Sequence, residues 1–191
     1  MKRNMTRRMT AAARIMKTDQ QYSYIRFHDV NAIEYVELTN QTCIYHKGGE
    51  KSYFNVLPQE ILETWCINHG SSMEGRITSA RILAGIRNKA PILISERSLT
   101  MFFPMRSIYG TNAANRNNIW INESEVLFHA GEGRSSVTII FRDGYRLQIN
   151  YDARSFAHQV QNCRLFREKL LQAEAKDAVL PADHTHASVV N

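Results

Sequence analysis

The clearest alternation of apolar and polar positions lies in the last third of the chain. Apolar side chains occupy every second position of 137–141 and of 145–149, and most of the positions between them are polar or charged. The Asp143-Gly144 pair lies between the two runs, and Asp-Gly is a strong signal for a tight turn. The pattern predicts an antiparallel hairpin with one buried face.

A weaker alternation runs through residues 30–57 and predicts further strands. A turn is expected at 39–41. Gly48-Gly49 suits a two-residue hairpin connection, because both residues can take positive φ angles. This part of the chain is therefore expected to form antiparallel hairpins as well.

Short apolar runs at 91–94 and 99–103 predict two buried strands, the second closed by Pro104. The apolar run that begins at Ile119 predicts another strand. Between them, 105–118 is a polar stretch rich in asparagine, and loops of this length are uncommon unless they bind something or are disordered.

Two segments have the apolar spacing of helices. In 58–68, Pro58 suits the first helical turn, and the apolar side chains from Ile61 to Cys66 repeat at one-turn spacing. In 155–174, Ser155 is a candidate cap. The apolar positions that share one face there are Phe156, Val160, Cys163, Phe166 and Leu170.

These elements predict a strand-rich α+β fold. It consists of antiparallel hairpins and small sheets, with one short middle helix at about 58–68 and a C-terminal helix at about 155–174. Between the helices, 70–76 resembles a turn-rich loop, and the apolar spacing of 76–89 fits a strand or a helix equally.

The domain organisation expected is one domain at 19–174 between two disordered ends. Residues 1–18 are a basic leader, with several methionines that could each start the chain, and 175–191 are polar and small. No apolar run approaches the ~20 residues of a membrane span, and the leader lacks the apolar stretch of a secretory signal, so a cytoplasmic location is expected. Three scattered cysteines without a CxxC pair indicate reduced, packed thiols.

Charge is unevenly distributed along the chain, which has a formal net charge of +6 and a pI of about 9.4. The leader has six basic and no acidic residues, and residues 19–69 have three basic and seven acidic residues. Residues 70–116 have seven basic and two acidic residues, and residues 134–169 have seven and three. Two basic blocks suit one positive face for an anionic partner, and solvated surface arginines are the alternative.

Catalytic and metal sites are not indicated. His69 lies beside Ser71 and Ser72, but no strand–GxSxG–helix context surrounds them. The phosphate-binding motifs GxxxxGK[ST] and GxGxxG are absent. His184 and His186 lie in the polar tail without further ligands. The prediction is a protein that is not an enzyme and has no cofactor or metal.

Several short blocks, taken in order, resemble the ComK family of competence transcription factors over roughly 30–170. The blocks are 66–76 (CINHGSSMEGR), 89–92 (KAPI), Phe103-Pro104, Ile119-Trp120, Asp143-Gly144 and 155–160 (SFAHQV). The chain departs from the family at Met105, where threonine is common. The stretch 113–171 is also similar to LytTR-type DNA-binding domains.

The resemblance implies a bacterial activator of DNA-uptake genes. Such proteins bind paired AT-rich boxes in double-stranded DNA as homodimers or tetramers, largely through the minor groove. Characterised members continue into a C-terminal segment that an adaptor recognises for delivery to an ATP-dependent protease. This chain ends soon after its helix in a different sequence, so that adaptor and protease are not expected as partners here.

Candidate DNA contacts follow from the chemistry of groove recognition. Arginines and amide side chains suit the narrow, negative minor groove of AT-rich DNA, and the 115–118 loop offers both. Other basic side chains suit phosphates. The candidate DNA-binding residues are Arg76, Arg81, Arg87, Lys89, Asn115, Arg116, Asn117, Asn118, Arg142 and Arg146. Trp65 and Trp120 are assigned to the core.

Two alternatives remain open from the sequence. One is a LytTR-like DNA-binding output domain that is not tied to competence. The other is a protein-interaction module whose arginines bind an acidic partner. Promoter occupancy in cells distinguishes the first from the competence activator, and salt-dependent duplex binding distinguishes the second.

Overall fold

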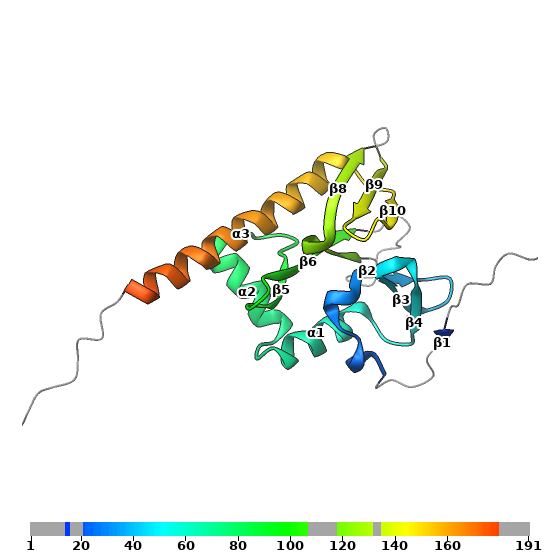
Figure 1. Cartoon of the computed structure of the whole chain (residues 1–191), viewed down its shortest axis with the longest axis horizontal. Helices are drawn as coiled ribbons and strands as arrows, with labels where there is room; N and C mark the ends of the chain where they lie inside the picture. Colours follow the sequence, from blue (N-terminus) through cyan, green and yellow to red (C-terminus); the bar gives the residue numbers. More distant parts are fainter. Residues whose placement is uncertain (1–13, 16–20, 107–117, 132–134, 180–191) are drawn as a thin grey trace, which may run out of the picture.

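A computed structural model of the protein describes residues 14–15, 21–106, 118–131 and 135–179 (Figure 1). Two sheets and three helices make up this part of the chain. The seven-stranded sheet has the order β1 (Arg14–Ile15), β4 (Lys51–Phe54), β3 (Gln41–His46), β2 (Val30–Val36), β7 (Asn118–Asn122), β6 (Thr100–Arg106) and β5 (Ile92–Ser95). The three-stranded sheet has the order β10 (Arg146–Ile149), β9 (Val137–Phe141) and β8 (Val126–Gly131). The helices are α1 (Pro58–Asn68), α2 (Met73–Ala84) and α3 (Ala153–Val179).

Both faces of the seven-stranded sheet are covered. One face packs on α1 through residues such as Ile33, Phe102 and Trp120, which meet the buried side of the helix around Trp65. Phe103 lies on the other face, which packs on the three-stranded sheet and on α3. Alternate residues of each strand thus serve two cores, which is why neighbouring strand positions are both buried.

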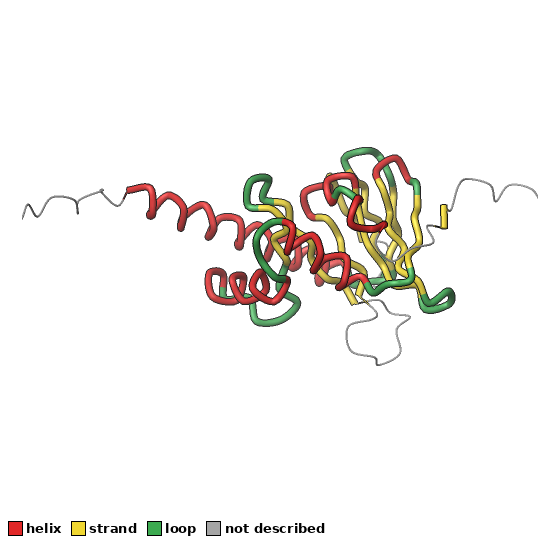
Figure 2. Tube along the Cα trace, turned by 90° about the horizontal axis from the view of Figure 1, so that it is seen from below, coloured by secondary structure: helices red, strands yellow, loops and turns green. Residues whose placement is uncertain are grey.

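The long helix α3 joins the two sheets along one side of the molecule (Figure 1). Its predicted apolar face is buried: Phe156 packs edge-on against Phe103 at a centroid distance of 5.4 Å, and Phe166 is fully covered. Figure 2 shows the rest of the helix extending beyond the strands. This face packs on the protein's own two sheets.

The predicted α+β class is confirmed, and several local predictions are too. The helix at 58–68 and the β9–β10 hairpin form as expected, and Gly144 has the positive φ of 83° that the turn needs. Gly48 and Gly49 also take positive φ angles, although the β3–β4 connection runs from Lys47 to Glu50 and is longer than two residues.

The segment 76–89, whose apolar spacing fits a strand or a helix equally, is helical as far as Ala84 and belongs to α2. Its apolar side chains on the cores are Met73, Ile77, Ala80 and Ala84. Two of these are alanines and the helix also buries the charged Arg76, so the apolar stripe is faint. Ser72 caps the helix by accepting a hydrogen bond from the amide of Gly75 at 3.0 Å. The segment that resembled a turn-rich loop therefore contains the cap and first turn of a helix.

Two predicted boundaries are wrong. Pro104 does not close its strand: β6 continues to Arg106, and Pro104 lies opposite Trp120 of β7. β5 pairs with β6 only as far as Phe102, so this part of β6 has a strand on one side only, where proline is tolerated. The C-terminal helix begins at Ala153 instead of 155, because Asp152 accepts the hydrogen bond from the amide of Ser155. At its other end the helix continues to Val179.

Most of the expected disordered ends fall outside the described residues, but residues 175–179 of the expected tail belong to α3. Within the segment assigned to the leader, Arg14–Ile15 pairs in parallel with β4 as β1. His184 and His186 lie outside the described residues as well. In the described part, no group of three or more His, Cys, Asp or Glu side chains is arranged to hold a metal ion.

All three cysteines are buried and unpaired, as predicted. Burial raises the pKa of Cys43 to about 11 and that of Cys66 to about 12, and it raises the pKa of Cys163 as well. We expect each thiol in the native protein at pH 8 to react with a thiol reagent at least about a hundredfold more slowly than free cysteine, and all three to react at once in denaturant. A thiol that reacts rapidly in the native protein would contradict this packing.

Candidate nucleic-acid interface

The amide-rich loop predicted to read bases lies mostly outside the described residues. This applies to Asn115, Arg116 and Asn117. Asn118 is the first residue of β7 and lies opposite Arg106 of β6. The loop therefore connects two neighbouring strands of the seven-stranded sheet.

Arg76 is part of the scaffold. It is only 6% exposed, and its guanidinium forms an ion pair with Glu96 and donates a hydrogen bond to the carbonyl of His69 at 3.0 Å. The side chain thereby ties α2 to the end of α1 and to the β5–β6 turn. A buried, paired guanidinium is not presented to a phosphate, so we do not carry Arg76 into the interface proposed below.

Arg81, Arg87 and Lys89 form an exposed basic group at the end of α2 and in the connection to β5. Gly85, with a φ of 67°, ends the helix and turns the chain toward this connection. The ammonium of Lys89 donates a hydrogen bond to the hydroxyl of Tyr151 and lies 5.1 Å from the centre of its ring. Lys89 is therefore fixed beside the junction between β10 and α3, and Arg81 and Arg87 precede it along the chain.

Arg142 and Arg146 lie at the other end of β10. Val137, Ile139, Phe141 and Leu147 are buried in the core, so the alternate positions of the hairpin face outward. Arg146 is exposed and lies opposite Ile140, and Arg142 is exposed in the turn. The structure thus places both arginines on the side of the hairpin that the alternation predicts.

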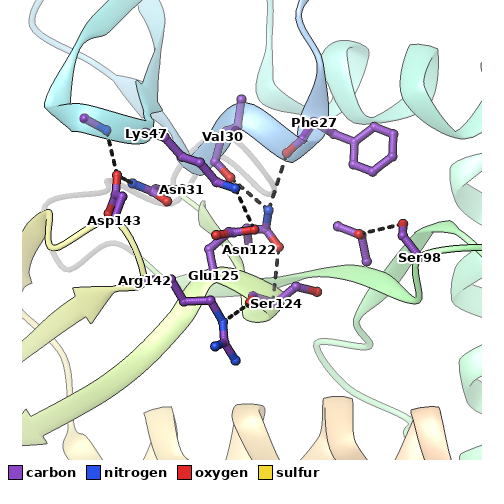
Figure 3. A network of polar contacts seen from close by, with 12 residues as sticks. Phe27, Val30, Asn31, Lys47, Ser98, Asn122, Ser124, Glu125, Arg142 and Asp143 are labelled. Atoms are coloured by element: carbon purple, nitrogen blue, oxygen red, sulfur yellow. Dashed lines mark hydrogen bonds and ion pairs between the residues drawn. The ribbon is translucent and has the colours of Figure 1, made fainter.

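A polar network fixes the position of Arg142 (Figure 3). Its Nε donates to the carbonyl of Ser124 at 2.8 Å, and its backbone amide donates to the carbonyl of Glu125 at 2.8 Å. Figure 3 shows the end of the guanidinium pointing away from the network. With Nε occupied and the end of the group exposed, Arg142 can offer its terminal nitrogens to a phosphate in a fixed orientation.

The segment that holds Arg142 is itself attached to the seven-stranded sheet. Asn122 is fully buried; its side-chain amide donates to the carbonyl of Val30 at 2.9 Å, and its oxygen accepts from the amide of Ser124 at 3.2 Å. Lys47 forms an ion pair of 2.9 Å with Glu125. These contacts join the start of β8 to the β2–β3 region.

Asp143 is directed at the seven-stranded sheet and away from the arginines beside it. Its carboxylate accepts from the side chain of Asn31 at 3.0 Å, from the amide of Gly48 at 2.6 Å and from the amide of Tyr145 at 3.0 Å. Burial raises the pKa of Asp143, but these hydrogen bonds outweigh that effect and hold the pKa below its usual value. The carboxylate of the turn is thus stabilised by neutral donors, and its hydrogen bonds go to groups other than Arg142 and Arg146.

The exposed basic residues have no acidic partner within the part of the chain that the structure describes. The ion pairs there join Lys47 to Glu125, Arg76 to Glu96 and Arg167 to Glu123. Arg81, Arg87, Lys89, Arg142 and Arg146 take part in none of them. Their charges are available to an external anion.

Sequence reasoning missed the groups that fix this turn, which are the carbonyl of Ser124 that holds Arg142 and the side chain of Asn31 that binds Asp143. The Asp143-Gly144 pair indicated a turn, but nothing near it in the sequence pointed to Asn31 or Ser124. The contact between Asn31 and Asp143 joins positions 112 residues apart. Only the packing of the two sheets brings them together.

Comparison with known proteins gives one match. The family model described as ComK protein matches residues 15–175, which covers most of the chain. No curated protein and no solved structure matches. No helix in the described ranges is long and apolar enough to cross a membrane.

Proposed function

Because the chain belongs to the ComK family, we propose that it is a DNA-binding transcription activator of competence genes. Membership of a transcription-factor family also supports a role other than catalysis. The target that we propose is double-stranded DNA with paired AT-rich boxes, bound by a homodimer or tetramer.

The observation that carries the proposal is the pair of arginines on the β9–β10 hairpin. Arg142 and Arg146 are exposed near one turn, Arg142 is held by Ser124, and the acid between them is bound elsewhere. Fixed guanidinium groups without a nearby free carboxylate suit phosphate contacts, which set the affinity and the register on a duplex.

The second basic group extends the same role along β10. Lys89, the last residue of this group, lies beside Tyr151, just past the end of this strand, and Arg146 lies at its start. β10 has four residues, and three steps of extended chain span about 10 Å, which is the length of about three phosphates on one strand. We assign these five basic residues to phosphates.

Base reading we assign to the loop between β6 and β7. Arg116 and the neighbouring Asn115, Asn117 and Asn118 have the side chains that suit a narrow, AT-rich minor groove. In this assignment the loop provides sequence preference and the basic groups provide affinity.

A duplex titration tests the function. A probe with two spaced A-tract/T-tract boxes is compared with a GC-rich probe of equal length over a series of salt concentrations. We expect tight binding that prefers the AT probe and weakens steeply with salt. Equal weak binding to both probes, or none, would contradict the proposal and favour an acidic protein partner.

A further inference from the structure

Two large apolar side chains lie next to each other on the surface of β8. Leu127 is 61% exposed and Phe128 is 57% exposed, although neighbouring strand residues normally point to opposite faces. The reason is a β-bulge: Val126 pairs with Phe141, whereas Phe128 pairs with Ile140, so Leu127 is an extra residue. Bulges of this kind re-aim side chains next to functional sites.

These side chains share a surface with the hairpin arginines. Phe128 lies opposite Ile140, and Ile140 lies opposite Arg146, so the three form one row across the outer face of the three-stranded sheet. Arg142 is anchored to Ser124, just before β8. The exposed apolar pair therefore shares a face with Arg146 and follows, along the chain, the segment that anchors Arg142.

The charge of this surface identifies its partner. None of the residues of β8, β9 and β10 is acidic, and the carboxylate of Asp143 is bound to the seven-stranded sheet. A second copy docked here about a two-fold axis would bring the arginines of both copies together without compensating acids. A nucleic-acid duplex provides the negative charge, and its base steps can accept an apolar side chain.

We propose that Phe128, supported by Leu127, is an apolar wedge that enters a base step of the bound duplex while Arg142 and Arg146 hold the flanking phosphates. Insertion between base pairs unstacks them partially and bends the duplex away from the protein side. This wedge rests on the proposed function, because it requires that the protein bind DNA. It adds a role that basic side chains alone do not provide.

The test is duplex bending, measured by energy transfer between dyes at the two ends of the AT probe. Wild-type protein is expected to shorten the end-to-end distance. Phe128→Ala is expected to abolish most of this change and to weaken binding about tenfold, since a half-exposed aromatic side chain no longer becomes buried. The salt dependence of binding should be unchanged, because no phosphate contact is lost.

Leu38→Ala is the matched control, since Leu38 is 99% exposed in the β2–β3 turn, away from this surface. It should alter neither bending nor affinity.

Phe128→Leu should retain part of the bending, and thermal melting checks that each variant is folded. Unchanged bending by Phe128→Ala overturns the wedge while leaving the proposed function intact. If Phe128→Ala keeps the bending but changes the molecular mass measured by light scattering, the surface instead binds a second copy of the protein.

Discussion

Replacing Arg142 and Arg146 together by alanine is expected to weaken duplex binding about 30-fold at roughly 0.15 M salt. Each contact between a guanidinium and a phosphate releases close to one counterion from the duplex, and at this salt concentration each release corresponds to about a fivefold change in affinity. Both side chains are exposed and have no ion-pair partner among the described residues, so their removal should cost little folding stability.

The measurement is the slope of log affinity against log salt. The double variant should have a slope smaller in magnitude by about two, and each single variant one smaller by about one. Arg26→Ala with Arg97→Ala is the matched control, because both arginines are exposed and lie outside the proposed interface. If the control pair lowers the slope and the hairpin pair does not, the interface lies on another surface.

The elements that were predictable are those whose signals are local. The β9–β10 hairpin follows from strict alternation around Asp143-Gly144, and α1 follows from Pro58 and a single apolar stripe ending at Cys66. The apolar positions of α3 repeat at helical spacing over a long stretch and do not fit the alternation of a strand. In each case the residues that decide the structure lie within one or two turns of the element itself.

The remaining features depend on packing between distant parts of the chain. The buried positions of α2 are Arg76 and Ala80, so its helical period is nearly invisible in the sequence. The strand β6 continues through Pro104 because β5 stops short of it. The central pairing of β2 with β7 joins residues nearly 90 positions apart. No local pattern specifies such a register.

The candidate site also has some features that local sequence patterns predict and others that depend on distant packing. Alternation correctly placed Arg146 on the outer side of its hairpin, because that depends on local geometry. It could not show that Arg142 is held by Ser124, or that Phe128 is turned outward by a bulge. The basic composition of its segment made Arg76 a candidate DNA contact like the other arginines. Its exposure, however, is decided by the elements packed around it.

Arg76→Ala is expected to lower the free energy of unfolding by about 2–3 kcal/mol. The variant leaves the carbonyl of His69 without its donor and a gap where the side chain packed between α1 and α2. Losing one partner of a fully buried ion pair would cost more, but the side chain of Glu96 is 65% exposed and stays solvated.

Arg76→Met is the informative companion variant. Methionine refills most of the volume, and Nε of Arg76 is already buried without a partner among the described residues, so the loss should stay below about 1 kcal/mol. Denaturant unfolding measures both changes. In the folded variants, the salt dependence of duplex binding should equal that of the wild type, because a buried guanidinium makes no phosphate contact. A reduced salt slope for Arg76→Met, with stability retained, would show that Arg76 leaves its ion pair to bind DNA.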